Sequence, residues 1–239
     1  MAQGVAWAAR ELGVPATIVV PEHAPATKLA AIERLGGTVV KVPYERWWQT
    51  MLDSHFEGIE GLFVHPVQDP AVMAGNGTIG LELAEDLAHI DAVLVPWGGG
   101  GLFTGIASAL AAVSPRTRLY AVEPETGAPL AAELAGHAEP IDYRASFVDG
   151  AGGKSLLQPM WERARPLLTG SHVASLDETA AAVRLLAERA RVVAEGAGAL
   201  AVAAALKHGA AGERIVCVVS GGNIDAERLA EILAGRTPR

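Results

Sequence analysis

Apolar positions along the chain follow two alternating periods. Short runs rich in Val, Ile and Leu predict buried strands, and apolar residues spaced three or four positions apart predict amphipathic helices. Strands are expected at residues 16–20, 38–42, 61–66, 93–96, 119–124 and 214–219. Helices are expected at 1–12, 27–35, 45–57, 103–113, 176–194 and 226–233, with a further helix ending near Ala88. Because helices and strands alternate, the pattern predicts an α/β protein with parallel sheets.

A change in composition around residues 58–69 divides this pattern into two parts. We therefore expect a small α/β domain at residues 1–66 and a larger domain at 67–239. Half of the 239 residues are hydrophobic, so the chain is long and apolar enough to bury a substantial core.

Charge and cysteine content narrow the class of protein. The formal net charge is −8, the isoelectric point is near 5.4, and no run of basic residues occurs. These properties argue against nucleic acid or an anionic membrane surface as a partner. The single cysteine, Cys217, lies in an apolar run and predicts core packing. With no visible signal peptide, we expect a cytoplasmic protein.

One uncharged stretch, residues 92–115, superficially resembles a membrane span. Pro96 and four consecutive glycines interrupt it, so a strand, a turn and a helix are the better interpretation.

That stretch contains the strongest candidate for a binding site. Gly98, Gly99, Gly100 and Gly101 separate a predicted buried strand from a helix that follows Leu102. Glycines allow the backbone to turn sharply, and a helix N-terminus has N–H groups without intrahelical acceptors together with a partial positive charge. Strand, turn and helix therefore predict an anion site suited to a phosphate. A flexible turn with no ligand is the alternative that the motif leaves open.

A second turn, Ser220-Gly221-Gly222-Asn223, follows the last predicted strand. Ligands of open α/β sheets bind at the carboxyl ends of the strands, so both turns could face one crevice. Ser220 could then offer its hydroxyl to a ligand, or it could bond the local backbone of the turn.

Two other motifs are weaker than they look. Gly75, Gly77 and Gly80 match the spacing of a dinucleotide-binding fingerprint, but no strand directly precedes them, so close helix packing is the better interpretation. Lys154 ends a sequence similar to a phosphate-binding loop, yet Val148 stands where the first glycine is required. A mobile or substrate-facing loop is expected there, and a plain solvated turn is the alternative. The seven histidines show no metal-ligand spacing.

Taken together, the motifs resemble a known family, the fold-type-II pyridoxal-phosphate-dependent enzymes, and within it the threonine/serine dehydratase and serine racemase group. The segments that match lie in order along the chain at residues 2–6, 16–21, 65–82, 95–102, 122–124, 193–199 and 220–223. The resemblance implies two open, mainly parallel sheets flanked by helices, as in the tryptophan synthase β-like fold. The larger domain would bind the cofactor.

The resemblance also implies roles for particular residues. The backbone from Gly98 to Leu102 would hold the phosphate of pyridoxal 5′-phosphate, and Ser220 would hydrogen-bond its pyridine nitrogen. Some relatives bind a divalent cation through a glutamate that matches Glu123. Pro129 stands where a second acidic ligand is expected, which argues against a metal here.

The start of the chain departs from the family. Family members have a preceding segment with the lysine that forms the Schiff base and a Ser-Gly-Asn-His-Ala-Gln-Gly motif, whereas this sequence begins Met1-Ala2-Gln3-Gly4. None of its four lysines, Lys28, Lys41, Lys154 and Lys207, matches the family's position. We therefore expect no catalytic lysine in this chain, and we interpret it as most of a dehydratase whose start is missing.

The activity implied is β-elimination of water from L-threonine or L-serine, giving a 2-oxo acid and ammonia, in an enzyme that is commonly a homodimer. A non-catalytic relative that binds phosphate or the cofactor is one alternative. A nicotinamide-binding protein is another, although Phe103 and Thr104 stand where the third glycine of its fingerprint would be needed.

Overall fold

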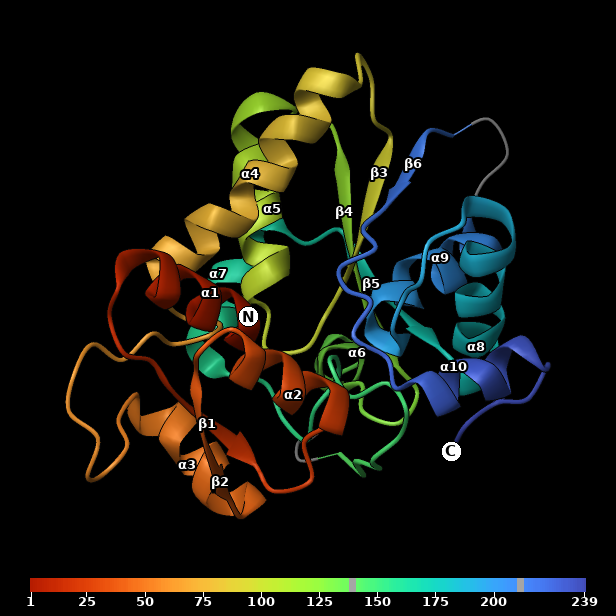
Figure 1. Ribbon diagram of the computed structural model, residues 1–239. Coiled ribbons are helices and arrows are strands. Elements are labelled where there is room, and N and C mark those ends of the chain that lie inside the picture. The colour runs from red at the N-terminus through yellow and green to blue at the C-terminus, as the bar shows by residue number, and fades with distance from the viewer. Residues whose placement is uncertain (138–140, 210–212) are drawn as a thin grey trace. The chain divides into compact units, whose positions relative to one another are not determined.

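The computed structural model describes residues 1–137, 141–209 and 213–239. Its internal contacts divide the chain into two compact units, Met1–Asp69 and Pro70–Arg239. Each unit has its own parallel sheet, as the alternating pattern predicted (Figure 1).

The first unit is a two-stranded parallel sheet with three helices. Its elements are α1 (Ala2–Leu12), β1 (Thr17–Pro21), α2 (Ala26–Arg34), β2 (Thr38–Val42) and α3 (Tyr44–Asp53). The strands pair in register from Thr17 with Thr38 to Pro21 with Val42. Gly13 ends α1 in the left-handed conformation, with φ of 67°, a backbone state that favours glycine.

The strand expected at residues 61–66 is absent from the described structure, so that expectation was wrong. Gly61 has φ of 131°, which is incompatible with a regular strand. The His65 ring then holds the chain in a turn, because its Nδ1 atom accepts hydrogen bonds from the backbone N–H groups of Val67 and Gln68, at 3.0 and 2.9 Å.

The second unit is built on a four-stranded sheet in the order β5-β4-β3-β6. All three described pairings are parallel. The strands are β3 (Ala92–Pro96), β4 (Arg118–Pro124), β5 (Gly170–Ala174) and β6 (Ile215–Cys217). The helices are α4 (Pro70–Asp86), α5 (Gly101–Val113), α6 (Pro129–Leu134), α7 (Gln158–Ala164), α8 (Leu176–Leu185), α9 (Gly196–His208) and α10 (Ala226–Leu233), with a 3₁₀ turn at Arg165–Leu167 and a π-helical turn at Leu186–Ala190.

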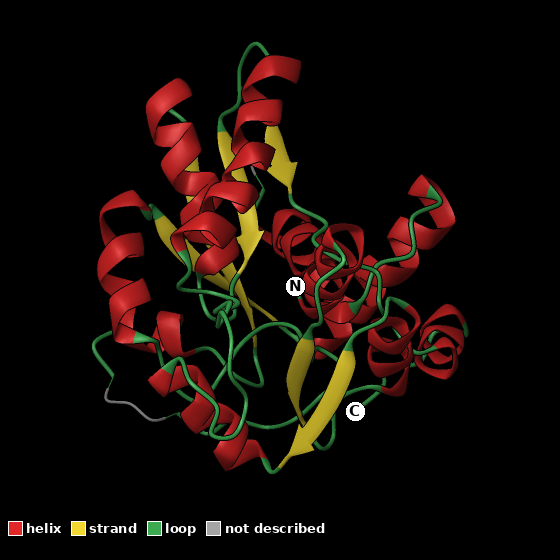
Figure 2. Cartoon of the chain, turned by 60° about the vertical axis from the view of Figure 1, so that its left-hand side comes forward, coloured by secondary structure: helices red, strands yellow, loops and turns green. Residues whose placement is uncertain are grey.

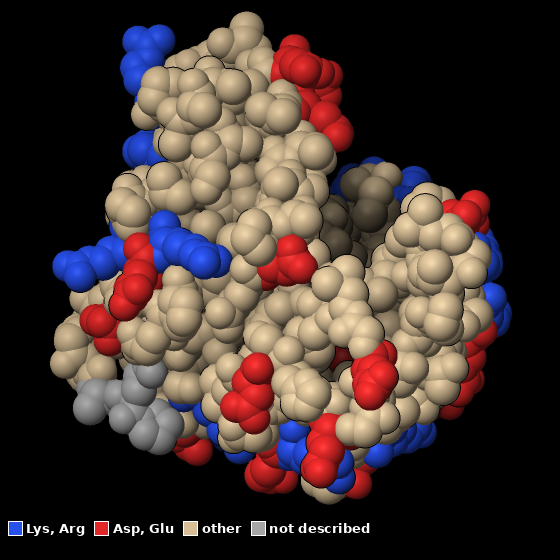
Figure 3. All heavy atoms as spheres, turned by 90° about the vertical axis from the view of Figure 1, so that its left-hand side faces the viewer, with Lys and Arg blue, Asp and Glu red and all other residues tan. Residues whose placement is uncertain are grey.

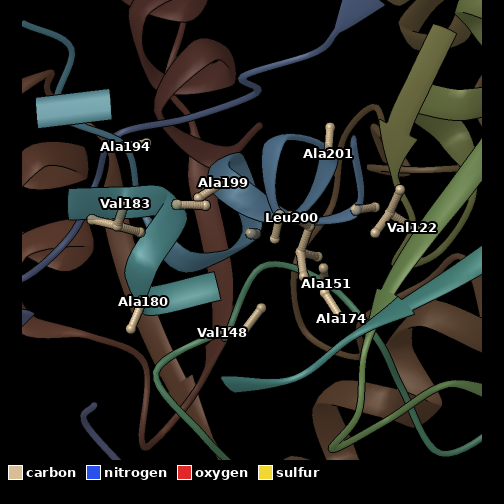
Figure 4. Close-up of a cluster of buried hydrophobic side chains, with 14 of the residues drawn as sticks. Val122, Val148, Ala151, Ala174, Ala180, Val183, Ala194, Ala199, Leu200 and Ala201 are labelled. Carbon is tan, nitrogen blue, oxygen red and sulfur yellow. The ribbon is translucent and has the colours of Figure 1, made fainter. Parts of the chain in front are cut away.

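The helices cover both faces of this sheet (Figures 1 and 2). On one face, α4, α5 and α7 pack over an apolar cluster that includes Val93, Val95 and Ile106. On the other face, α8 and α9 enclose a second cluster around Leu200 and Val122, drawn in Figure 4. Because every residue of β3 is buried, its sequence is a continuous apolar run rather than an alternating one.

Several elements between residues 124 and 176 were not predicted from the sequence. β5 has a single β-branched residue, Val173, and lies at the edge of the sheet, where a strongly apolar run is not required. α6 and α7 have only 6 and 7 residues, too few for a clear helical period. The helix expected at 176–194 ends earlier, since α8 passes into the π-helical turn and Arg191 adopts the left-handed conformation, with φ of 59°.

Gly75, Gly77 and Gly80 lie within α4, and two of them, Gly77 and Gly80, pack against α5, as the helix-packing interpretation predicted. A Cβ atom added at Gly77 would lie 3.1 Å from the Gly105 carbonyl oxygen, and one at Gly80 would lie 2.9 Å from the Ile106 carbonyl oxygen. The absence of side chains at these positions therefore lets the backbones of α4 and α5 approach closely.

Candidate cofactor site

The glycine turn lies at the carboxyl end of the central strand β3. The strand's hydrogen bonding continues to its next residue, because the Trp97 N–H donates to the Val122 carbonyl oxygen at 2.8 Å. Gly100 is the N-cap of α5 and has φ of 92°, a left-handed backbone conformation that residues other than glycine rarely adopt. The turn therefore leads directly from a buried strand into a helix.

The first turn of α5 has the electrostatics of an anion site. It contains no acidic side chain, and the N–H groups at a helix start have no acceptor within the helix. Their dipoles sum to a partial positive charge at this end. The helix continues for 13 residues, so this potential is that of a full helix rather than of an isolated turn.

The segment around Ala151 packs directly beside the turn. The Gly152 N–H donates to the Trp97 carbonyl oxygen at 2.8 Å. A Cβ atom at Gly98 would meet the Ala151 Cα and the Gly150 carbonyl oxygen, each at 3.4 Å. The sequence predicted here only a mobile or substrate-facing loop or a plain solvated turn, and the run of small residues from Gly150 to Gly153 was its signal.

The second predicted turn follows β6, the neighbour of β3. The two strands are parallel and pair Leu94 with Cys217, and the pairing continues where the Val218 N–H donates to the Leu94 carbonyl oxygen at 3.0 Å. Ser220 and the Gly98 turn therefore follow adjacent strands at the same edge of the sheet. Ser220 is exposed at this edge.

The N-terminus of α9 supports the Ser220 turn. The Glu195 N–H donates to the Gly221 carbonyl oxygen at 3.0 Å. A Cβ atom at Gly198 would lie 2.3 Å from that same oxygen. Glycine at position 198 is thus required for the turn to rest on the helix.

Glu123, the predicted metal-binding residue, is fully buried at the end of β4. Its carboxylate oxygens accept hydrogen bonds from the backbone N–H groups of Leu130 at 3.0 Å and Ala131 at 2.8 Å, at the start of α6. These bonds give the buried carboxylate a structural role. In the part of the chain that the structure describes, no three His, Cys, Asp or Glu side chains form a group suited to a metal ion. That Glu123 holds no metal, as Pro129 suggested, stays a prediction.

Three of the four lysines lie in helices or strands, and Lys154 lies in a loop. Lys28 is in α2 and Lys41 in β2, both in the first unit. Lys207, near the end of α9, forms a 2.7 Å ion pair with Glu178. The Lys154 carbonyl oxygen accepts a hydrogen bond from the Ile141 N–H at 3.1 Å.

Two buried polar atoms at the glycine turn test whether a phosphorylated cofactor fits there. Trp97 Nε1 and Thr104 Oγ1 have no hydrogen-bond partner among the described residues. Burying such groups without partners costs free energy, so they are uncommon away from ligand or water sites. Together with the left-handed turn at Gly100 and the start of α5, these two atoms fit a bound phosphate group.

Fold and site define a class of protein: an open parallel α/β protein with a glycine turn and a helix N-terminus at the carboxyl edge of its sheet. The sequence matches the family described as pyridoxal-phosphate dependent enzyme over residues 1–221. It is 38% identical over 236 residues to an L-threonine ammonia-lyase of Thermotoga maritima, with 97% of this chain and 59% of that protein covered.

Solved structures give the same assignment. The processed form of threonine deaminase isoform 2 from Solanum lycopersicum superposes with a TM-score of 0.83 at 31% identity, covering 98% of this chain and 67% of that one. Maize serine racemase superposes with a TM-score of 0.84 at 30% identity, covering 98% and 74%. The chain belongs to the pyridoxal-phosphate-dependent enzyme family, in the fold-type-II group that contains threonine dehydratases and serine racemases.

The chain spans 59% of the length of the Thermotoga relative. Within residues 1–137, 141–209 and 213–239, no helix is both long and apolar enough to cross a membrane. On the face drawn in Figure 3, basic side chains are dispersed among acidic ones and form no continuous basic area.

Proposed function

We propose that this chain is the cofactor-holding part of a threonine or serine ammonia-lyase, an enzyme that eliminates water from a hydroxy amino acid. The observation that carries the proposal is the glycine turn at the start of α5, where Gly100 has φ of 92° and no acidic side chain opposes an anion. The names of the relatives support the reaction, since they include L-threonine ammonia-lyase and threonine deaminase.

In this proposal each part of the site has one task. The backbone N–H groups from Gly98 to Leu102 bind the phosphate of pyridoxal 5′-phosphate, and the segment around Ala151 orients it. The Ser220 hydroxyl hydrogen-bonds the pyridine nitrogen as a neutral partner, which leaves the ring less electron-withdrawing than a carboxylate would. When bound, the cofactor supplies an electron sink for the bonds at the substrate's α-carbon.

We further propose that none of the four lysines of this chain serves as the catalytic lysine, so that it binds the cofactor reversibly. The alternative is a non-catalytic relative that uses the same site only for binding. A cytoplasmic, homodimeric enzyme without a divalent cation at Glu123 completes the proposal.

The proposal is tested by titrating the purified chain with pyridoxal 5′-phosphate and following absorbance, then adding borohydride and analysing the lysines by mass. We expect saturable binding without a covalent adduct. Ser220→Ala should weaken binding about 5-fold, because one neutral hydrogen bond contributes about 1 kcal/mol. An adduct on Lys28, Lys41, Lys154 or Lys207 would show that a lysine of this chain does react and would overturn this part of the proposal.

A matched pair of variants tests the glycine turn itself. Gly100→Ala introduces a Cβ atom 2.8 Å from the Trp97 ring at a residue with φ of 92°, and it should reduce affinity at least 10-fold, a loss of about 1.4 kcal/mol. Gly136→Ala strains a backbone with φ of 73° where no atom lies within 4 Å, and it should leave affinity unchanged. Equal affinities for both variants would contradict a phosphate site at this turn.

A further inference from the structure

Trp97 lies directly beneath the glycine turn. Its side chain is 1% exposed, and its ring packs so closely on Gly100 that a Cβ atom there would lie 2.8 Å from Cη2 and 3.0 Å from Cζ2. The ring therefore occupies the side of Gly100 on which any other residue would place its side chain.

The same ring also contacts the first turn of α5. Trp97 and Phe103 meet edge to face, with ring centroids 5.6 Å apart and planes inclined at 62°. Such a pair has a preferred geometry, so it fixes the relative orientation of the strand end and the helix start. The Thr104 N–H donates to the Gly100 carbonyl oxygen at 2.9 Å, which ties the helix to the residue above the ring.

Packing rather than hydrogen bonding holds the indole in this place. Its Nε1 atom has no hydrogen-bond partner within the described residues, although the residue is fully buried. The backbone of Trp97, in contrast, is held by the Val122 and Gly152 hydrogen bonds, both at 2.8 Å. The hydrogen-bonded end of the strand thus places a flat ring against Gly100, and glycine is the residue type with the greatest backbone freedom.

We propose that Trp97 is a positioning residue for phosphate binding: its ring holds Gly100 in the left-handed conformation and so preorganises the N–H groups of the turn. This inference rests on the proposed function, because it assumes that the turn binds the cofactor phosphate. Preorganisation matters because a turn that must be ordered on binding gives up affinity for its ligand.

The test separates phosphate recognition from general stability by using two ligands, pyridoxal 5′-phosphate and pyridoxal, which lacks the phosphate. The ratio of their dissociation constants is measured for the wild-type chain and for Trp97→Leu, Trp97→Phe and Trp161→Leu. Trp161 is the matched control, since it is a buried tryptophan, 8% exposed, in the same apolar cluster.

We expect Trp97→Leu to reduce the preference for the phosphorylated ligand about 10-fold while affinity for pyridoxal changes little. Trp97→Phe keeps an aromatic ring beneath Gly100 and should retain most of the preference for the phosphorylated ligand. Trp161→Leu should retain it as well. An unchanged ratio in Trp97→Leu, or an equal loss in Trp97→Phe, would overturn the inference. A wild-type chain that binds both ligands equally would instead contradict the proposed phosphate site.

Discussion

His65 shows how one buried side chain determines the path of the backbone. It is 4% exposed, its Nδ1 atom accepts two backbone hydrogen bonds, and its Nε2 atom lies 3.0 Å from the Met51 carbonyl oxygen. These partners require a neutral ring with its proton on Nε2. The sequence identified His65 only within a family motif, and its role in the turn became visible through its contacts.

This geometry predicts a pH dependence of stability. Burial lowers the pKa of His65, so the unfolded chain binds a proton at this residue at a higher pH than the folded chain does. The free energy of unfolding should therefore fall as the pH drops below about 6.5, the usual histidine pKa, and should be unaffected by His65 above it.

Urea unfolding of His65→Asn between pH 5 and 8 checks this expectation. Asparagine does not titrate, and its side-chain oxygen can still accept backbone hydrogen bonds, so the variant should lose less stability on acidification than the wild type. His55→Asn is the control, because His55 is exposed. Identical pH profiles for His65→Asn and the wild type would show that His65 is not the source of the acid sensitivity.

The packing of α4 on α5 was predictable from the sequence only in part. Gly77 and Gly80 of α4 were correctly interpreted from the sequence as packing residues, but the helix on which they pack was not predictable. Gly105 of α5 is the tightest contact, since a Cβ atom there would lie 2.3 Å from the Met73 carbonyl oxygen and 2.9 Å from the Asn76 Cβ atom. The N-terminus of α5 forms part of the candidate site, so the packing of α5 on α4 positions the site.

Gly105→Ala should therefore destabilise the protein by about 1–3 kcal/mol, because the added methyl group forces two backbones apart. Gly75→Ala is the matched control in α4, where no atom lies within 4 Å of the added Cβ. The control should be stabilising by roughly 0.5–1 kcal/mol through the higher helix propensity of alanine. Denaturant unfolding measures both, and equal effects would contradict the close packing of α4 on α5.

At the scale of the whole molecule, the residues of the candidate site lie in one unit. Gly98, Gly100, Trp97 and Ser220 all belong to Pro70–Arg239, whereas Met1–Asp69 has a separate sheet and core. Ligand binding to the folded state stabilises it by mass action, by about 2.7 kcal/mol at a ligand concentration 100 times the dissociation constant.

Pyridoxal 5′-phosphate should consequently raise the midpoint of thermal unfolding and slow amide hydrogen exchange in α5 and in residues 218–223. Gly100→Ala should reduce both effects, while Gly136→Ala should keep them. Protection confined to the elements of Met1–Asp69 would place the ligand elsewhere in the chain.

The sequence by itself determined the α/β class, the β3 strand, both turns and the family. These follow from local properties: apolar periodicity, glycine at strand ends and motifs in a fixed order. Its expectations were weakest where local signals are weak, as in the short α6 and α7, the edge strand β5 and the turn at His65.

Only the tertiary structure decided which segments meet. The sheet order puts β6 beside β3, although more than one hundred residues separate them, and so places the two turns at one edge. It also placed the Ala151 segment against Gly98, the Trp97 ring beneath Gly100 and the Glu123 carboxylate on the N–H groups of α6. Such contacts depend on how distant segments pack, and a pattern read along one chain contains no direct record of those distances.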